Sequence, residues 1–500
     1  MRKDAIVFTL LVALFAAARL WGLADYCLDC DEIWSLRFAR QDWGGLLTAV
    51  AEDVSHPPLF YLLLKAWIAV GGESLVWLRL FPAVTAIACV VPLLLFCRSL
   101  RLGWAETNLA VALLAVNGFL IYFAQQLRMF DLLQFFALCS LWRFVKFVEA
   151  PAGDRRNWAS LALVNVLLVY SHYWGWVLVG TEGLYLLLCR RDKVLPFAVG
   201  VLVAVACFVP WVVAVAWAAL HRGSAVAQIQ WIGKPGWADL VRFYAKLTGG
   251  FRLPGTTAVG LALFLAPVVL WAGRLAAGRA RLLPSRERFG SAGASPSRAD
   301  DRQTFTLLAL VAVVPPVLTF AASHALPQSV WAERQLTFVA GPFLMLVAAA
   351  VWRLPRPAAR VVPAACCTWA AAAGLAAVAA PPKIAWDRLA ADLVEAEPAG
   401  PVTVYAADAH VAWCLGFYLD EAHQTRFTVV TGAEPAGERF WVAYREPQTG
   451  TESLDRLIAR GYRAGPAHRS GTQWQTAAVV PVRRAAGGEE AEHPPTETRP

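Results

Sequence analysis

Long apolar runs separated by short polar segments fill the chain up to about residue 380. Each run holds roughly 18–22 residues, long enough as a helix to cross a hydrocarbon layer of about 30 Å. The pattern therefore predicts about eleven membrane-spanning helices in a mainly α-helical, polytopic fold. We place the spans at residues 5–23, 78–97, 106–123, 131–147, 158–171, 175–189, 194–217, 256–273, 304–322, 335–352 and 361–380.

Basic residues in the connections predict the orientation of these spans, because cytoplasmic loops carry an excess of Lys and Arg. Clusters that begin at Arg98, Arg143, Arg190, Arg274 and Arg353 fall on alternate connections, on the same side as the N-terminus. We therefore expect a multi-pass protein of the plasma (inner) membrane with a cytoplasmic N-terminus. The opposite side receives two long outer loops, at residues 24–77 and 218–255.

The connecting segments differ in character. In the first outer loop, Asp31–Val50 and Pro58–Val70 read as amphipathic helices lying along the membrane surface. The second outer loop interleaves aromatic and basic residues, as an interfacial aromatic belt does. On the cytoplasmic side, residues 284–303 are rich in Ser, Gly, Ala and Arg and read as a flexible linker.

The composition changes after Ala380. We predict a transmembrane module over residues 1–381, a small extracytoplasmic α/β domain over 382–482, and a disordered tail over 483–500. An odd number of spans puts the small domain outside the membrane. Its expected elements, in order, are a helix Trp386–Glu397, a strand Val402–Ala406, a helix His410–Leu419, strands Arg426–Val430 and Arg439–Tyr444, a helix Ser453–Arg460 and a strand Thr476–Val482.

Composition and charge exclude several classes of protein. Hydrophobic residues make up 58% and charged residues 16%, against roughly 45–50% and 25% in soluble domains, so a cytosolic enzyme and a disordered chain are excluded. The net charge of +9 comes from clusters between apolar runs, so we expect no nucleic acid partner. Most of the ten cysteines lie in apolar stretches, which predicts neither a disulfide framework nor a zinc module. Cys27 and Cys30 either form a small disulfide or pack separately.

Two polar clusters lie in the first outer loop. In Cys27-Leu28-Asp29-Cys30-Asp31-Glu32, the adjacent carboxylates of Asp31 and Glu32 are either solvated or act as a base and its electrostatic neighbour. In Asp53-Val54-Ser55-His56-Pro57-Pro58-Leu59, the prolines start a helix and need no other function. Asp53 and His56 in front of that helix are then either unused or functional.

Two further clusters lie at the outer ends of spans. Tyr122-Phe123-Ala124-Gln125-Gln126-Leu127-Arg128-Met129-Phe130-Asp131 places an arginine where it must extend to the interface or pair. Tyr170-Ser171-His172-Tyr173-Trp174 places a histidine among aromatic residues, where it is either structural or catalytic.

Taken in order, these four clusters resemble the GT-C membrane glycosyltransferases. The resemblance is closest to the bacterial branch grouped with protein O-mannosyltransferases and with the lipopolysaccharide-modifying aminoarabinose and galacturonic acid transferases. Glu333-Arg334-Gln335-Leu336-Thr337-Phe338 is similar to a late Arg-Tyr-Leu segment of that branch, and the resemblance covers roughly residues 5–352. The chain departs from the family at Gln126, where an acidic residue is usual, and at Gln335, where Tyr is usual.

The resemblance implies transfer of a sugar, with inversion, from a polyprenyl phosphate to a hydroxyl of an envelope glycan, glycolipid or protein at the outer membrane face. Asp31 and Glu32 are the implied catalytic residues, with Asp31 as the base; Asp53 and His56 are acceptor-side or supporting residues; Arg128, His172 and Arg334 are the implied ligands of the donor phosphate. Membrane lipids are further expected partners. No cofactor is certain, although His56 with nearby carboxylates can hold a divalent metal ion or simply form hydrogen bonds.

Two other functions compete with this interpretation. A secondary transporter is also polytopic and basic, but it places ionisable residues near the bilayer midplane in repeated halves, whereas here they concentrate at the outer ends of the spans. A non-catalytic scaffold for envelope assembly is the other alternative.

Overall fold

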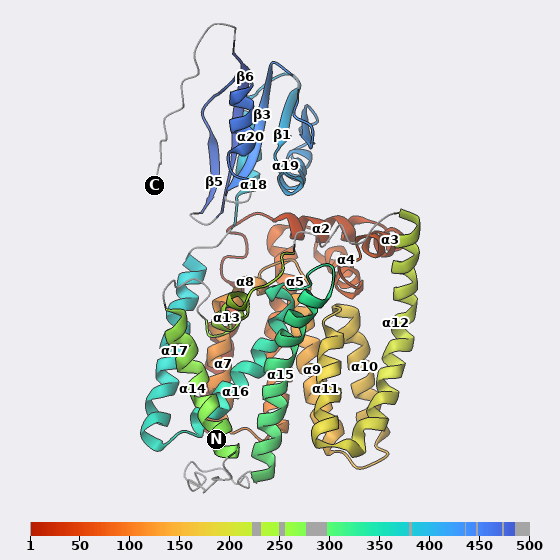
Figure 1. The fold of residues 1–500 in the computed structure, drawn as a ribbon, viewed down its shortest axis with the longest axis vertical. Coiled ribbons are helices and arrows are strands. Elements are labelled where there is room, and N and C mark those ends of the chain that lie inside the picture. The colour runs from red at the N-terminus through yellow and green to blue at the C-terminus, as the bar shows by residue number, and fades with distance from the viewer. Residues whose placement is uncertain are drawn as a thin grey trace. The chain divides into compact units, whose positions relative to one another are not determined.

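The computed structural model describes residues 2–222, 232–249, 256–276, 298–379, 383–435, 437–446, 449–472 and 475–485. Its contacts divide the chain into two compact units. The helical unit consists of Met1–Leu23 and Phe38–Ala379, and the C-terminal unit consists of Ala24–Arg37 and Ala380–Pro500 (Figure 1). The first outer loop, which the sequence suggested as one segment over residues 24–77, is thus shared between the two units.

A helix is found at the position of each predicted span. The helices of these segments are α1 (Arg2–Leu20), α5 (Leu75–Ala88), α6 (Val90–Ser99), α7 (Trp104–Ala115), α8 (Gly118–Ala124), α9 (Phe130–Glu149), α10 (Arg155–Ser171), α11 (Gly175–Cys189), α12 (Val194–Arg222), α14 (Thr257–Ala276), α15 (Arg298–Ala325), α16 (Ala340–Trp352) and α17 (Arg356–Ala379). Among the described residues, six helical segments are long and apolar enough to cross a membrane, or seven if α7 and α8 count as one bent span. The chain is a multi-pass membrane protein, and the count of about eleven spans stays a prediction.

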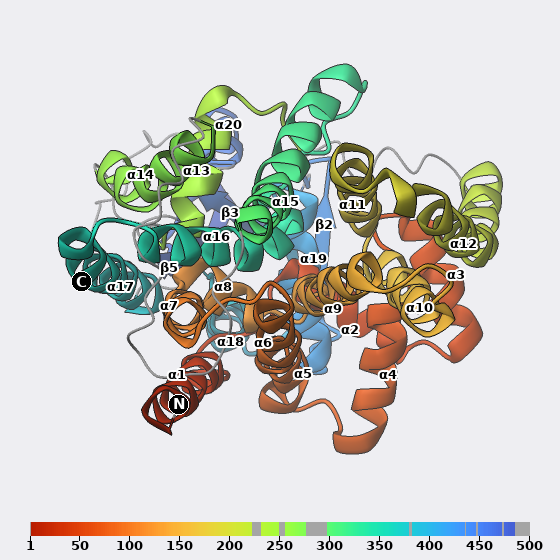
Figure 2. The ribbon, with the colours of Figure 1, turned by 90° about the horizontal axis from the view of Figure 1, so that it is seen from below.

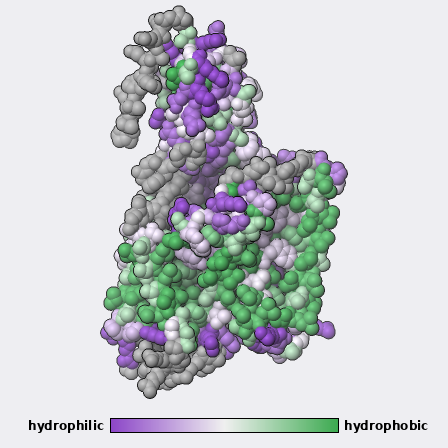
Figure 3. All heavy atoms as spheres, viewed as in Figure 1, coloured by the Kyte–Doolittle hydropathy of each residue, from purple (hydrophilic) through white to green (hydrophobic). Residues whose placement is uncertain are grey.

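The outer surface of the helical unit is apolar. On α12, Leu202, Val213 and Leu220 are 66%, 59% and 83% exposed. Figure 3 shows a broad hydrophobic surface on the visible face of this unit, bordered by hydrophilic residues at its lower edge. A soluble protein rarely exposes so large an apolar surface, so we assign this surface to contact with lipid.

Helix α16 lies at the centre of the helical unit. It contacts α7, α14, α15 and α17, and Figure 2 shows these helices around it. Every residue from Ala340 to Val351 is buried, as expected for a helix that is hydrophobic on all sides. Gly341 permits a close approach, since a Cβ at this position would lie 3.2 Å from the side chain of Leu138 on α9.

The third predicted span, 106–123, is not one straight helix. The chain bends by 64° between α7 and α8, because Asn117 starts a new helix by accepting a hydrogen bond from the Leu120 N–H at 3.1 Å. The bend frees carbonyl groups at the end of α7. The guanidinium of Arg19 donates to those of Leu114 and Ala115 at 3.0 and 3.3 Å and is 1% exposed.

A second buried polar contact joins three helices. Ser140 Oγ on α9 lies 2.6 Å from Asn165 Oδ1 on α10 and 2.8 Å from Glu182 Oε1 on α11. All three side chains are buried. Interhelical hydrogen bonds of this kind hold helices together where lipid removes the hydrophobic driving force between them.

The amphipathic segments of the outer loops form short helices. The predicted single helix Asp31–Val50 is wrong in one respect, because the chain forms α2 (Cys30–Arg40) and α3 (Trp43–Asp53). Asp42 separates them by accepting a hydrogen bond from the Gly45 N–H at 2.6 Å as the N-cap of α3. The second predicted segment is α4 (Leu59–Gly71).

In the second outer loop, α13 (Trp237–Leu247) is described, whereas residues 223–231 and 250–255 lie outside the described residues. Residues 284–297 of the predicted linker 284–303 also lie outside the described residues. Residues 298–303 are the first residues of helix α15, so the predicted end of the linker is wrong. The predicted tail 483–500 lies outside them from residue 486.

The C-terminal unit contains a mixed sheet of six strands within its described residues, with the order β2-β1-β3-β6-β4 and β5 paired to β6. Strands β2 and β3 run parallel to β1, whereas β3, β4 and β5 run antiparallel to β6. The elements are α18 (Trp386–Ala396), β1 (Val402–Ala406), α19 (Ala409–Glu421), β2 (Phe427–Thr431), β3 (Arg439–Glu446), α20 (Glu452–Ala459), β4 (Tyr462–Ala464), β5 (His468–Thr472) and β6 (Gln475–Arg484). All seven predicted elements are present, and the short strands β4 and β5 were missed.

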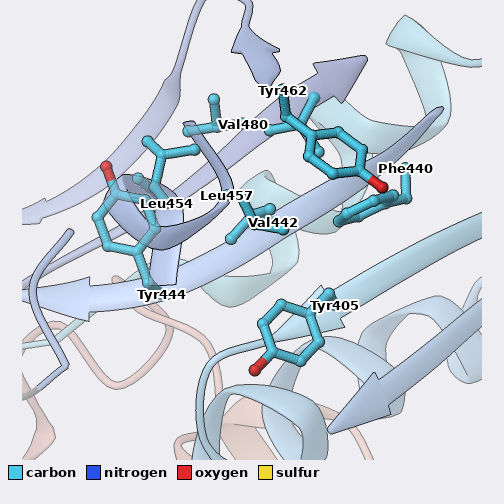
Figure 4. Close-up of a cluster of buried hydrophobic side chains, with 10 residues drawn as sticks. Tyr405, Phe440, Val442, Tyr444, Leu454, Leu457, Tyr462 and Val480 are labelled. Carbon is cyan, nitrogen blue, oxygen red and sulfur yellow. The ribbon is translucent and has the colours of Figure 1, made fainter. Parts of the chain in front are cut away.

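Both faces of this sheet are covered. Side chains from β1, β3, β4 and β6 pack with α20 in one buried cluster, which includes Tyr405, Phe440, Tyr444, Leu454 and Tyr462 (Figure 4). Helices α18 and α19 contact strands of the sheet and each other. Burial on both faces explains why β3 reads as a continuous apolar run rather than as an alternating one.

The Arg19 contact gives a test of the bend between α7 and α8. Arg19→Met keeps the length of the side chain but leaves the carbonyls of Leu114 and Ala115 unpaired, and a buried unpaired polar group costs about 1–3 kcal/mol. We expect a lower thermal unfolding midpoint for the purified variant in detergent. The matched control is Arg360→Met on α17, where the arginine is exposed. Equal midpoints for both variants would contradict this role of Arg19.

Candidate active site

The helical unit brings together four basic side chains that the sequence suggested separately. The rings of His56 and His172 lie 4.9 Å apart and are tilted by 48°. The positive charges of Arg128 and Arg334 act on both imidazoles. These residues come from four separate segments of the chain, so only the packing of the helices makes them one site, which we call the basic cluster.

His56 is held by the turn between α3 and α4. Helix α3 ends at Val54, whose φ of 59° lies in the left-handed region. A β-branched residue rarely adopts this conformation, and strain of roughly 1–3 kcal/mol is typical of functional sites. Pro57 and Pro58 then start α4, so His56 is fixed between a strained turn and a rigid helix start. Its side chain is 6% exposed.

His172 ends α10 and is fully buried. Its Nδ1 accepts a hydrogen bond from the Trp174 N–H at 3.1 Å. A neutral imidazole with an accepting Nδ1 carries its proton on Nε2. Nε2 of His172 and Nδ1 of His56 are buried and have no hydrogen-bond partner among the described residues. Buried polar atoms of this kind are rare and point to a ligand or to a functional role.

The two arginines lie at the ends of helices. Arg128 is in the turn between α8 and α9 and is only 6% exposed. Arg334 is half-buried in the 3-10 helix η3 (Glu333–Val339), which leads into the central helix α16. The neighbouring Glu333 forms an ion pair with Lys246 of α13, which holds the start of η3 in place.

The electrostatics of the basic cluster favour an anion. Burial and the nearby arginine charges lower the pKa of His56 well below its ordinary value, and they lower the pKa of His172 to about 3. Both imidazoles are therefore neutral N–H donors at physiological pH. Charged and neutral donors around one point suit the oxygens of a phosphate group.

The carboxylates Asp31 and Glu32 lie in the C-terminal unit and have different surroundings. Glu32 Oε2 lies 2.7 Å from Lys383 Nζ, and both side chains are at most 2% exposed. It also accepts a hydrogen bond from the Asp29 N–H at 3.1 Å. Asp31 is half-buried in the first turn of α2. Glu32 thus has a structural ion pair that the sequence did not suggest.

Asp53 is the last residue of α3 in the helical unit. Burial and the Asp53 charge raise the pKa of the Tyr173 phenol, which lies beyond the end of α10. Asp53 and the Tyr-Ser-His-Tyr segment, which come from two of the family-like motifs, are therefore close enough to interact electrostatically. The divalent ion suggested for His56 stays a prediction.

Sequence reasoning missed a polar cluster in the C-terminal unit. His410 Nε2 lies 3.3 Å from Asp29 Oδ1, and the thiols of Cys30 and Cys414 lie beside this pair. Burial opposes a charge on His410, but the hydrogen bonds to Asp29 and Cys30 raise its pKa to about 9. Hydrogen bonding by Cys414 lowers the pKa of Cys30 to about 6 against the effect of burial. The spacing of His410 and Cys414, four residues apart on a helix, was the available signal.

Cys27 and Cys30 are not joined by a disulfide. The Cys27 thiol lies 3.6 Å from the carbonyl oxygen of Ile384, and burial raises its pKa to about 11. The two thiols therefore pack separately, which was one of the two alternatives left open by the sequence.

A comparison of the sequence with family models and with curated proteins finds no match. Solved structures do resemble the chain. ArnT from Cupriavidus metallidurans bound to undecaprenyl phosphate aligns with 95% of this chain and 97% of its own, at 13% identity and a TM-score of 0.56. The apo state of that protein aligns over the same shares at 14% identity and a TM-score of 0.43.

The oligosaccharyltransferase AglB from Archaeoglobus fulgidus, with an inhibitory peptide and a dolichol-phosphate, aligns with 92% of this chain and 72% of its own, at 11% identity and a TM-score of 0.46. Of these three structures, the undecaprenyl-phosphate complex of ArnT has a TM-score above 0.5, and at 13% identity it shows the fold. The resemblance expected from the ordered motifs is thus confirmed for the fold. This chain has the fold of the GT-C membrane glycosyltransferases, in the form found in the bacterial ArnT branch.

Proposed function

We propose that this protein is a glycosyltransferase that takes a sugar from a polyprenyl phosphate and transfers it, with inversion, to a hydroxyl group. The acceptor is an envelope glycan, glycolipid or protein, and the reaction takes place at the outer face of the plasma (inner) membrane. The C-terminal unit lies outside the membrane in this proposal, and the N-terminus lies in the cytoplasm. The ArnT structure with the same fold was solved with undecaprenyl phosphate, which supports the choice of donor.

One observation carries the proposal. The basic cluster combines two arginines with two buried imidazoles, and Nε2 of His172 and Nδ1 of His56 lack a partner among the described residues. Desolvated donors without partners are costly, so a site of this kind is stable when an anion fills it. In a membrane protein with long apolar surfaces, a lipid phosphate meets both requirements, because its head is an anion and its tail is apolar.

The charge of the cluster also suits the chemistry. When the bond between C1 of the sugar and the phosphate oxygen breaks, its electrons stay on that oxygen, and the phosphate goes from about one negative charge to about two. Donors that are already in place stabilise this growing charge without having to reorganise. Arg128 and Arg334 supply the positive charge, and the neutral imidazoles supply N–H groups.

The acceptor hydroxyl must lose a proton as its oxygen attacks C1. We propose Asp31 as the base that takes this proton, with Asp53 as a supporting carboxylate and His56 on the acceptor side of the phosphate. The environment of Glu32 supports this assignment of roles within the pair. Glu32 neutralises the buried Lys383, so a second task as a base would leave that ammonium without its counter-charge.

Donor consumption separates this function from the alternatives. The purified protein is incubated in nanodiscs with labelled polyprenyl-phosphate sugars and an envelope extract as the source of acceptor. We expect release of polyprenyl phosphate and label in the acceptor. A transporter or a scaffold leaves the donor intact, so intact donor across the panel of sugars would contradict the proposal.

Arg128 gives the first specific test. Lys keeps the positive charge but loses the planar fork that binds two phosphate oxygens at once. We expect Arg128→Lys to weaken the binding of polyprenyl phosphate about tenfold or more, since a hydrogen bond to a charged group contributes about 1.5–3 kcal/mol. The measurement is a titration with polyprenyl phosphate in which native mass spectrometry detects the bound lipid. Arg360→Lys on the exposed side of α17 is the control, and unchanged affinity in Arg128→Lys would assign this arginine to anchoring a helix end.

Asp31 gives the second test. Asp31→Asn keeps the shape of the side chain but removes its basicity, and general-base assistance contributes roughly two to four orders of magnitude in rate. We expect transfer to fall by about that factor while binding of polyprenyl phosphate is unchanged. Activity above about a tenth in Asp31→Asn, together with an inactive Asp53→Asn, would move the base to Asp53.

Glu32 provides the matched comparison for Asp31. Glu32→Gln removes the carboxylate that pairs with the buried Lys383 ammonium, and breaking a buried pair in this way costs about 3–5 kcal/mol. Its main effect is therefore expected in thermal stability. The double variant Glu32→Gln with Lys383→Met removes both charges and should recover most of the lost stability, whereas Asp31→Asn should not change the unfolding midpoint.

A further inference from the structure

A group of metal-ligating side chains lies in the C-terminal unit, apart from the residues of the proposed reaction. Cys30 comes from the first outer segment, and His410 and Cys414 come from α19. One ligand atom from each residue lies within 4.8 Å of the others. Both thiols are buried and His410 is partly exposed. Among the described residues, this is the one group of three or more such side chains that satisfies this distance.

The local structure brings the three side chains to one place. His410 and Cys414 are four residues apart on α19, so they project from the same face of the helix. Cys30 is the first residue of α2, with its N–H held at 2.8 Å by Asp29 Oδ1. A hydrophobic core would be served by apolar residues at these positions, whereas two thiols and an imidazole form a soft ligand set.

The fit to a tetrahedral ion follows from bond lengths. Zinc binds thiolate sulfur at about 2.3 Å and imidazole nitrogen at about 2.0–2.1 Å, so neighbouring ligand atoms lie roughly 3.4–3.8 Å apart. The ligand atoms lie within 4.8 Å of one another, so binding requires them to approach by at most about 1.0–1.4 Å, which side-chain rotation can supply.

The carboxylate of Asp29 lies beside the three side chains and contacts two of them without being counted among the ligands. Its Oδ1 lies 3.3 Å from His410 Nε2 and 3.9 Å from Cys414 Sγ, and it accepts a hydrogen bond from Trp386 Nε1 at 3.3 Å. Carboxylates beside metal-bound histidines fix the orientation of the ring and strengthen binding. Three protein ligands leave one position of a tetrahedral ion for a water molecule.

We propose that Cys30, His410 and Cys414 bind a zinc ion, with Asp29 orienting the ligands, and that this ion fastens the segment Ala24–Arg37 to the C-terminal domain. The site does not depend on the glycosyltransferase activity. It also revises the expectation, drawn from the spread of cysteines along the sequence, that the chain has no zinc module. Cys30 lies some 380 residues before His410, so the pair on α19 is the only local signal and no motif connects it to the third ligand.

A zinc ion at this site would affect the start of α2. The segment Ala24–Arg37 already makes other contacts within the C-terminal unit, since Tyr418 donates a hydrogen bond to the Leu28 carbonyl at 2.9 Å and Lys383 pairs with Glu32. A metal at Cys30 adds a bond one residue before Asp31. It would thus fix the position and direction of the first turn of α2, which carries both carboxylates.

The test measures metal directly on the full-length protein, purified in detergent without chelator. Elemental mass spectrometry should find about one zinc per chain. His410→Asn and Cys414→Ala should each lose most of this zinc, whereas His423→Asn and Cys27→Ala, which change the same residue types in the same unit, should keep it. Asp29→Asn should bind zinc about 10–100-fold more weakly. Zinc retained by both ligand variants would overturn the proposal.

A second measurement on the unchanged chain covers the case in which the variants fail to fold. The metal is removed with a chelator and the protein is titrated with Co²⁺, which should give thiolate-to-cobalt absorption and the visible bands of a tetrahedral ion. Zinc should also protect Cys30 and Cys414 from alkylation. Peptide mapping that finds a disulfide between Cys30 and Cys414, or an absence of cobalt bands in the reduced protein, would contradict the site.

Discussion

A polar atom that is buried away from water must find a partner inside the protein, and this constraint explains most of the architecture. In the helical unit it applies with particular force, because the surrounding hydrocarbon offers no hydrogen bonds. The bend after α7 is possible because Arg19 takes up the freed carbonyls. The contact between α9, α10 and α11 is specific because Ser140 meets Asn165 and Glu182.

The same constraint makes the exceptions informative. Nδ1 of His56 and Nε2 of His172 are buried without partners among the described residues, next to arginines whose charges lower the pKa of both rings. A strained Val54 holds one histidine, and the end of α10 holds the other. Other buried polar atoms also lack a partner among the described residues, but here two imidazole nitrogens and the Nε of Arg128 do so close to one another, and an anionic ligand is the simplest physical reason.

The C-terminal unit has its own apolar core, because helices cover both faces of its sheet. The segment Ala24–Arg37 carries charged and polar groups into this unit, and two of them have ion-pair partners there: Lys383 pairs with Glu32, and His410 pairs with Asp29. The cluster of Cys30, His410 and Cys414 lies at the same junction. The segment of the first outer loop that carries the proposed base is therefore part of the C-terminal unit.

The sequence by itself determined much of the fold. Apolar runs located the helices of the helical unit, because lipid-facing and core positions both need hydrophobic residues. In the C-terminal domain, seven elements were located from the sequence within a few residues. Two short strands were missed: β4 has only three residues, and β5 (HRSGT) has no hydrophobic residue. The ordered motifs also indicated the GT-C fold and named His56, Arg128, His172 and Arg334.

Only the tertiary structure decided which of these residues share a site and which do not. Asp31 and Glu32 are adjacent in sequence, yet Glu32 is buried against Lys383, a residue that no local pattern connects to it. Cys30 meets His410 and Cys414 for the same reason. A sequence pattern reports local propensity and burial, whereas the pairing of charges and ligands over hundreds of residues depends on how the whole chain packs.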